Sequence, residues 1–228
     1  MEKTPHWKFA AKVTSLGRNA NETSMRRGGL QNAVSFGNLL RFQTRKFPVL
    51  ALFKRNTPPM LAKIFLELTE YAWFRRIAWK PIYNHLAKQF PFDDWVFMNY
   101  GFDPDEASAR PTLSEADEPD RFPLQLYHFL ATQTDIAGKT MLEVGSGRGG
   151  GASYIARYLK PQEIIGMDIA DHAVEFANKR HKSPNLRYVT GNAEKIPFED
   201  ERFDVVINVE SSHAYGSVTS FFAEVKRV

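Results

Sequence analysis

The stretch TMLEVGSGRGGG, residues 140–151, decides the fold of this chain. Its first five residues are mostly apolar and predict a short strand. The glycines that follow let the backbone turn sharply and leave room for a ligand against the main chain. Gly145, Gly147 and Gly150 satisfy the G-x-G-x-x-G pattern of nucleotide-binding α/β proteins. Because that pattern alone is a weak signal, the residues around it must decide what the loop binds.

Strand and helix patterns alternate after this stretch. We expect further strands at 163–167, 186–190 and 203–209, and helices at 150–159, 171–181 and from 217 onward, with another helix at 121–134. Asp171 and Ser217 suit helix N-caps, and Val218, Phe221, Phe222 and Val225 should turn inward. The alternation predicts an α/β fold, a Rossmann-like parallel sheet with helices on both faces.

The charge of the N-terminal part differs from that of the rest. Residues 1–90 carry 16 Lys and Arg against 4 Asp and Glu, whereas residues 91–228 carry 14 against 22. We therefore divide the chain into a basic extension at 1–57, a helical cap or connector at 58–134, and a cofactor-binding domain at 135–228. The extension is either disordered or an organelle-targeting segment.

Residues 60–90 predict an aromatic, basic helix that Pro81 should stop or kink. Two interpretations stay open, namely a helix packed on the main domain and an interfacial helix on anionic lipid, with residues 60–80 as the peripheral membrane contact. No stretch of the sequence is apolar enough to span a bilayer. Localisation stays open between the cytoplasm and an organelle.

Composition excludes some chemistries. The chain has no Cys, so a disulfide, a thiolate nucleophile and a Cys-ligated metal site are all excluded, and we expect no metal site. Nucleic acid is not an expected partner either, because the basic charge lies on the N-terminal segment, outside the predicted cofactor-binding domain. The oligomeric state stays open.

Polar side chains follow each of the first three predicted strands. Glu143 lies two residues before the first glycine, Asp168 ends the second strand, and Asn192 follows the third. Open α/β sheets bind ligands at the carboxyl ends of their strands. There Glu143 suits a cationic ligand and would repel a pyrophosphate, Asp168 suits ribose hydroxyls, and Asn192 suits an adenine edge. Taken singly, Glu143 could instead be a strand-end acid, Asp168 a helix cap and Asn192 a turn residue. Arg148 could bind a phosphate or could be an exposed cation at the start of a helix.

Four stretches carry a more specific likeness: LYHFLATQT (126–134), GGGASY (149–154), GNAEKIPF (191–198) and FDVVINVESSH (203–213). Together they resemble the class I S-adenosylmethionine-dependent methyltransferases of the phthiotriolone dimycocerosate and ubiquinone–sterol type, which carry a methyltransferase type 11 domain. The resemblance runs from about residue 95 to residue 228. It implies that S-adenosylmethionine is the cofactor, and it assigns the cofactor-binding residues, which are Glu143, Gly145, Ser146 and Gly147 at the methionine end, Asp168 and Ile169 at the ribose, and Asn192 and Ala193 at the adenine. The family more often has Asp where Asn192 stands.

His213 follows the predicted fourth strand, and the fold places that strand end beside the transferred methyl group. A histidine, whose pKa is ordinarily near ~6.5, suits the removal of a proton from a hydroxyl acceptor. His213 is therefore the predicted catalytic base, with a loop histidine of purely structural role as the alternative. Tyr100 and Tyr215 are weaker pocket candidates.

The sequence thus predicts methyl transfer to an oxygen or carbon atom of a small lipid-like or polyketide-like acceptor, in lipid or secondary metabolism. Two alternatives are a truncated, non-catalytic cofactor-binding module and an NAD-dependent oxidoreductase. We also expect the fold to be C-terminally incomplete, as in a fragment, because the chain stops inside the helix after the fourth strand.

Overall fold

The computed structural model describes residue 64 and residues 67–89 and 95–228. The extension predicted at 1–57 lies outside these residues, as do Leu61 and Phe65 of the predicted aromatic helix. The described chain forms the following longer elements: α4 (Ala72–Gln89), α5 (Arg121–Ala131), β1 (Thr140–Val144), α6 (Gly150–Tyr154) continued by a π-helical turn (Ile155–Leu159), β2 (Glu163–Asp168), α7 (Asp171–Arg180), β3 (Leu186–Thr190), β4 (Val205–Ile207) and α8 (Val218–Arg227).

The four strands form one parallel sheet in the order β3-β2-β1-β4. β1 lies inside the sheet, pairing with β2 on one side and β4 on the other, and its residues 141–144 are all buried. An apolar run of this kind is typical of a parallel strand that is covered on both faces. The predicted parallel α/β sheet is confirmed, and only β4 is clearly shorter than the predicted 203–209.

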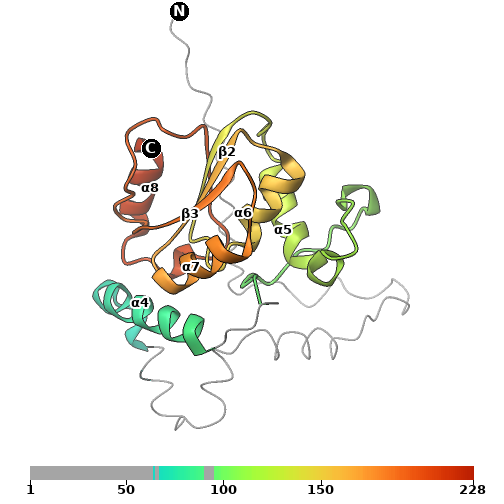
Figure 1. The fold of residues 1–228 in the computed structure, drawn as a ribbon. Coiled ribbons are helices and arrows are strands. Elements are labelled where there is room, and N and C mark those ends of the chain that lie inside the picture. The colour runs from blue at the N-terminus through green and yellow to red at the C-terminus, as the bar shows by residue number, and fades with distance from the viewer. Residues whose placement is uncertain (1–63, 65–66, 90–94) are drawn as a thin grey trace, which may run out of the picture. The chain divides into compact units, whose positions relative to one another are not determined.

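Helices cover both faces of the sheet, as Figure 1 shows with α5 and α6 on one side and α8 on the other. One apolar cluster joins α5, α6 and α7 to the face of Met141 and Ile164. A second cluster joins α8, through Phe221, to the face of Leu142 and Ile165. Because alternate strand residues point to opposite faces, neighbouring residues of β1 and β2 enter different layers.

α4 differs from its prediction, because the helix continues through Pro81 and does not stop there. It packs along α7, and Lys80 Nζ lies 3.2 Å from the Asp171 carboxylate. We attribute the continuation to this packing, which offsets the hydrogen bond that proline cannot donate. The same contact explains a second correction. Asp171 is not the N-cap of α7, because Ala170 holds that place and the Asp171 side chain pairs with α4 instead.

α8 begins as predicted and then departs from the prediction at one residue. The Ser217 hydroxyl accepts the backbone N–H three residues later at 3.1 Å, which confirms the cap. Phe221 is buried, and Phe222 and Val225 pack against the same cluster. Val218 is exposed, so its predicted inward position is wrong, because the apolar cluster on this side of the sheet takes in α8 only from Phe221 onward. No helix in the described residues is both long and apolar enough to cross a bilayer.

Candidate functional site

The glycine loop, residues 145–149, joins β1 to α6 at the carboxyl end of the sheet. The backbone N–H groups of Gly145 and Ser146 donate to the carbonyl oxygen of Met167 on β2, at 2.8 and 3.0 Å. Gly145, Gly147 and Gly149 have φ angles of 76°, 53° and 87°. These angles lie in the left-handed region that side chains disfavour, so the loop's path depends on glycine at alternate positions.

Glu143 lies beneath this loop and is fully buried. Its Oε1 accepts a hydrogen bond of 2.6 Å from the Tyr127 hydroxyl of α5, while Oε2 has no hydrogen-bond partner among the described residues. Burial raises the pKa of Glu143 from 4.5 to about 7, although hydrogen bonds from Tyr127 and the Ala152 backbone hold it down in part. A buried carboxylate with an unpartnered oxygen is destabilising unless a cation or a donor reaches it.

Asp168 links the end of β2 to the glycine loop. Its carboxylate accepts the N–H groups of Gly147 at 2.8 Å and of Ala170 at 2.9 Å, one on each oxygen. Burial raises its pKa, while these backbone donors and that of Ile169 act in the opposite direction. Each carboxylate oxygen can accept more than one hydrogen bond, so both keep capacity for ligand hydroxyl groups.

Ser146 and Ile169 stand beside these residues at the same edge of the sheet. Ser146 is buried, and its hydroxyl finds no hydrogen-bond partner in the part of the chain that the structure describes. Ile169, next to Asp168, is partly buried. Ser146 Oγ in the glycine loop and Glu143 Oε2 beneath it are therefore both buried without a hydrogen-bond partner among the described residues.

The turn after β3 brings Asn192 and Ala193 to this edge. The Gly191 N–H donates to the Asp168 carbonyl oxygen at 2.9 Å, which joins the ends of β3 and β2. The Asn192 side chain is exposed, and its Oδ1 accepts the Glu194 N–H at 2.9 Å. This hydrogen bond stabilises the turn and leaves the NH2 donors of Asn192 and the second lone pair of Oδ1 to meet a ligand. Ala193 is buried behind it.

A hydrogen-bonded cluster fixes the loop after β4 against the glycine loop. Asn208 Nδ2 lies 2.8 Å from the Val144 carbonyl oxygen, 2.7 Å from Ser211 Oγ and 2.8 Å from the Tyr215 hydroxyl. Ser211 Oγ and the Tyr215 hydroxyl also lie 2.9 Å apart. Tyr215, considered only a weak pocket candidate from sequence, is thus a fixed part of the site's framework.

His213 lies on a short 3-10 turn, Ser212–Ala214, within this loop. Its side chain is exposed, yet the atoms around the ring lower its pKa by partial desolvation. The ring is therefore neutral at pH 7 and can accept a proton. No hydrogen bond to His213 occurs within the described chain, so no described residue fixes its orientation.

Arg148 is neither exposed nor open to a phosphate, contrary to both of its predicted interpretations. It is buried, and its guanidinium carbon lies 3.5 Å from the ring centre of Phe176 and 5.5 Å from that of Trp95. Cation–π contacts of this kind hold the loop against α7.

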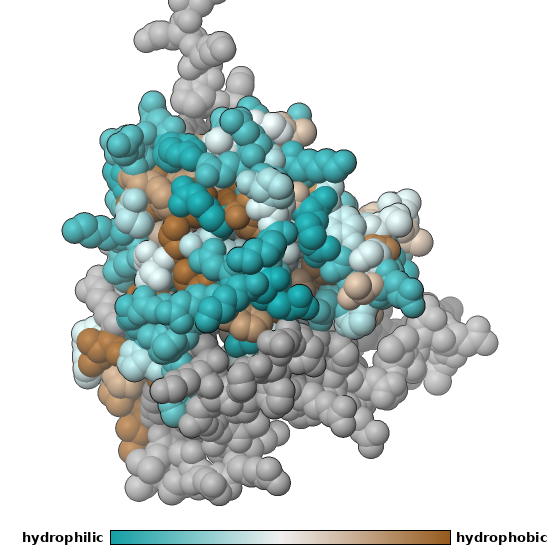
Figure 2. Space-filling view, in the orientation of Figure 1, coloured by the Kyte–Doolittle hydropathy of each residue, from teal (hydrophilic) through white to brown (hydrophobic). Residues whose placement is uncertain are grey.

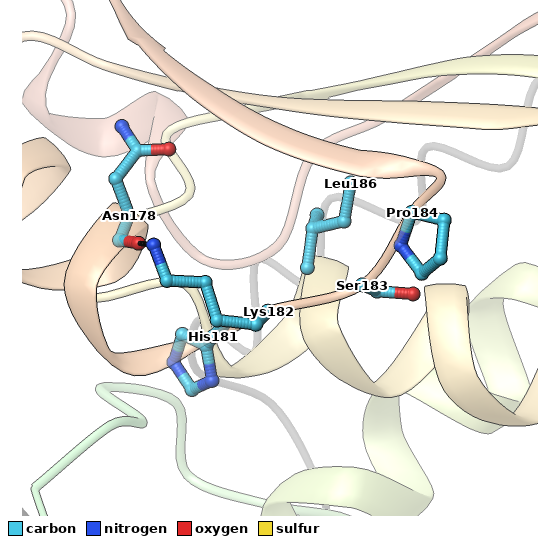
Figure 3. Close-up of a pocket in the computed structure, with 6 residues that line it drawn as sticks. All are labelled: Asn178, His181, Lys182, Ser183, Pro184 and Leu186. Carbon is cyan, nitrogen blue, oxygen red and sulfur yellow. Dashed lines mark hydrogen bonds between the residues drawn. The ribbon is translucent and has the colours of Figure 1, made fainter.

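A separate pocket of about 300 Å³ lies at the opposite edge of the sheet, where α7 ends and β3 begins. Figure 3 shows its lining, with Asn178, His181 and Lys182 on one side and Ser183, Pro184 and Leu186 on the other. Parallel sheets bind ligands at the carboxyl ends of strands, so this pocket is not the candidate site.

Sequence reasoning and structure agree on where the predicted residues gather. The structure brings the carboxyl ends of β1, β2, β3 and β4 together around the glycine loop, with Glu143, Asp168, Asn192 and the His213 loop all at that edge. The partner of Glu143, Tyr127, was missed. The closeness of Tyr127 is evident only in the structure, where a Cβ on Gly151 would lie 2.0 Å from Tyr127 Cε1.

Comparisons with known proteins agree with this geometry. Residues 142–228 match the family described as "Methyltransferase domain". The chain carries a methyltransferase domain. The resemblance found in the sequence is thereby confirmed, and so is the Rossmann-like fold class.

Relatives of the methyltransferase domain are known from curated proteins and from solved structures. The fatty-acid O-methyltransferase of Mycolicibacterium smegmatis is 45% identical over 66% of this chain and 55% of its own length. The phthiotriol/phenolphthiotriol dimycocerosates methyltransferase of Mycobacterium tuberculosis is 43% identical over 68% of this chain and 57% of its own length. Geranyl diphosphate C-methyltransferase from Streptomyces coelicolor matches with a TM-score of 0.49 and 22% identity, over 64% of this chain and 60% of that one. The chain thus spans little more than half the length of these curated relatives.

Proposed function

We propose that this chain transfers a methyl group from S-adenosylmethionine to an oxygen or carbon atom of a small lipid-like acceptor. One observation carries the proposal. Two carboxylates, Glu143 and Asp168, flank a glycine loop at the carboxyl edge of a parallel sheet, and Arg148, the loop's own cation, is turned away into an aromatic cage. Such a site suits a cationic nucleoside and disfavours a pyrophosphate.

The residues present fit this cofactor. Glu143 Oε2 and Ser146 Oγ are buried without a hydrogen-bond partner in the described chain, so the site has polar atoms to offer a ligand. An unmade buried hydrogen bond costs about 1–3 kcal/mol, and a ligand donor reaching Glu143 would recover that cost. The two oxygens of Asp168 keep acceptor capacity for two adjacent hydroxyls, as ribose presents them.

The cofactor would supply a methyl carbon already activated by its sulfonium. The chain's own task is then to bind, align and deprotonate. Asp168 and Ile169 would hold the ribose, Asn192 and Ala193 the adenine, and Glu143 the charged methionine end. His213, neutral at pH 7, would take the acceptor's proton.

The cofactor assignment is tested by isothermal titration of the protein with S-adenosylmethionine, S-adenosylhomocysteine, NAD and NADH. We expect the two adenosyl compounds to bind and the dinucleotides not to bind. Binding of a dinucleotide alone would overturn the assignment in favour of an oxidoreductase.

Replacing His213 with Ala should lower methyl transfer at least roughly 100-fold, since a general base contributes about 10²–10⁴. Affinity for S-adenosylhomocysteine should stay unchanged, because His213 lies outside the proposed cofactor contacts. The assay measures transfer of a labelled methyl group to a long-chain alcohol, because an alcohol keeps at pH 7 the proton that a base must remove, and the M. tuberculosis relative is named for an alcohol-type lipid, phthiotriol. Equal turnover in the variant and the parent would remove His213 from the mechanism.

We further propose that α4 rests on an anionic membrane surface from which lipid acceptors are drawn. Trp73 and Ile77 are 56% and 61% exposed, one helical turn apart on the same face. Figure 2 shows apolar residues gathered at the lower left of the molecule, where α4 lies. The helix contains four Lys and Arg and no acidic residue, so its charge complements anionic headgroups.

Vesicle sedimentation tests this contact. We expect Trp73→Ser/Ile77→Ser to reduce binding to phosphatidylglycerol-containing vesicles roughly tenfold, because two apolar anchors are lost. Val218→Ser, which removes an exposed apolar side chain on α8, is the matched control and should bind like the parent. Equal binding of the α4 variant and the control would argue against the membrane contact.

A further inference from the structure

Residues 95–101 pack against the glycine loop and the start of α6, and we call them the covering segment. A Cβ built on Gly147 would lie 2.6 Å from Met98 Cε, and one on Gly150 would lie 2.6 Å from Phe97 Cε1. The segment can approach the backbone this closely only because Gly147 and Gly150 have no side chain. The covering segment therefore lies directly on the loop that would hold the methionine end of the cofactor.

The side chains of the covering segment divide between two environments. Trp95 and Phe97 are buried and anchor the segment in the domain. Met98 and Tyr100 are 37% and 66% exposed. The chain bends at Asn99 between these two residues. Met98 Cε lies next to Gly147, and the Tyr100 N–H bonds to the loop after β4, so both exposed residues stand beside the proposed site. Methionine adapts its shape to its contacts, and tyrosine combines an apolar ring with a polar tip.

One hydrogen bond ties this surface to the loop that carries His213. The Tyr100 N–H donates to Glu210 Oε2 at 3.0 Å. Glu210 has a φ of 50°, a left-handed conformation that is uncommon and strained for a residue with a side chain. The next residue, Ser211, is held by Asn208 and Tyr215. The strained residue is thus fixed on one side by the cluster and on the other by the covering segment.

We propose that Met98 and Tyr100 bind the apolar chain of the methyl acceptor, and that Glu210 is the positioning residue that holds this surface beside His213. The inference rests on the proposed function and adds the place where the acceptor binds. An acceptor lying there has Gly147 and the proposed methyl donor on one side and the His213 loop on the other. Methyl transfer requires this arrangement, because donor and acceptor atoms must approach within about 3–3.5 Å.

The probe for this surface is cis-parinaric acid, a fluorescent long-chain fatty acid, titrated into protein saturated with S-adenosylhomocysteine. Met98→Ser/Tyr100→Ser should raise its Kd at least roughly tenfold, because two apolar contacts are lost. The Kd for S-adenosylhomocysteine should stay within about twofold, since neither side chain is needed to shape the glycine loop. Val218→Ser on α8 is the matched control for loss of an exposed apolar side chain and should leave both constants unchanged.

Glu210 is tested by two variants in the same titration and in the methyl-transfer assay. Glu210→Ala removes the acceptor of the Tyr100 N–H and should raise the KM for the long-chain alcohol several-fold, with a smaller change in kcat. Glu210→Gln keeps an acceptor oxygen and should restore the KM. If both variants behave alike, Glu210 has no positioning role.

The outcomes separate this inference from the proposed function. If the parent binds S-adenosylhomocysteine but the double variant binds parinarate as tightly as the parent does, the acceptor surface is wrong and the cofactor assignment stands. The same conclusion holds if the parent binds S-adenosylhomocysteine but does not bind parinarate. If parinarate binding depends on Met98 and Tyr100 while no adenosyl compound binds, the methyl-transfer proposal fails and the apolar surface remains.

Discussion

Glu143→Gln should make the protein more stable at pH 8 and should weaken its binding of S-adenosylmethionine by roughly 10- to 100-fold. The carboxyl group is fully buried, and burial raises its pKa from 4.5 to about 7. Above that pH the folded protein holds a buried negative charge with one oxygen unpartnered in the described chain. Only a ligand that brings a positive charge compensates for this instability, so the same side chain lowers stability and favours binding.

The sign of the pH dependence follows from where the proton is lost. The unfolded chain loses it near pH 4.5 and the folded chain near pH 7, so between these values the folded state binds more protons and its stability falls as pH rises. The shift in pKa lowers the free energy of unfolding by about 3 kcal/mol at pH values above 7 and has no effect below about pH 4.5. Glutamine is neutral throughout, so the variant's stability should not show this fall.

Denaturant unfolding at several pH values measures the difference between the variant and the parent. At pH 4.5 the variant should be less stable by about 1 kcal/mol, because its amide N–H groups replace an oxygen that has no described partner. By pH 8 the sign should have reversed. Glu199→Gln, which changes an exposed acid, is the control and should follow the parent at every pH. Parallel curves for Glu143→Gln and the parent would contradict the buried charge.

Binding provides a second measurement of the same group. The parent's affinity for S-adenosylmethionine should rise as pH increases toward about 7 and then level off, because the cation prefers the ionised carboxylate. The Gln variant should lack this dependence. A pH-independent affinity in the parent would place Glu143 away from the ligand's charge.

Local patterns in the sequence were sufficient to predict the framework of the site. β1 has the predicted bounds because a short apolar run between turn residues specifies a buried parallel strand without help from elsewhere. β3 also has the predicted bounds, although it is an edge strand with a single buried residue. Glu143 and Asp168 could be placed at one edge because parallel strands bring their carboxyl ends together. That inference required only the order of elements, not their detailed packing.

Contacts between distant elements could not be predicted in this way. Tyr127 meets Glu143 from a helix 16 residues upstream, and Tyr188 donates to the Gly149 carbonyl oxygen across 39 residues. Arg148 looked like an exposed cation because its burial depends on Trp95 and Phe176, which local sequence does not bring near it. Such contacts depend on how helices are placed on the sheet, and that placement is set by the whole core.

Gly145→Ala should destabilise the protein by about 2–4 kcal/mol and reduce cofactor affinity at the same time. The φ of Gly145 is 76°, which a side chain tolerates at a cost of roughly 1 kcal/mol. A Cβ at this position would also lie 2.2 Å from Ser211 Oγ and 2.5 Å from Ser211 Cβ. Ser211 is held by Asn208 and Tyr215, so it has no room to move aside without breaking that cluster.

Gly138 provides the matched control for backbone strain. Its φ of 68° is similar, but a Cβ there would meet nothing within 4 Å. Gly138→Ala should therefore cost only the roughly 1 kcal/mol of the backbone conformation, with cofactor affinity unchanged. The difference between the two variants measures the clash with Ser211 and with the Tyr215 hydroxyl, which would lie 3.0 Å from the new Cβ.

A second substitution identifies the origin of the clash. Ser211→Gly removes both atoms that the new Cβ would strike, so Gly145→Ala/Ser211→Gly should be more stable than the sum of the single effects predicts, by about 1–2 kcal/mol. Chemical denaturation of the four proteins completes the cycle, and titration with S-adenosylhomocysteine follows the site. If the two substitutions are simply additive, the loop after β4 does not press on the glycine loop. The framework that holds Glu210 and His213 beside the cofactor site would then need another explanation.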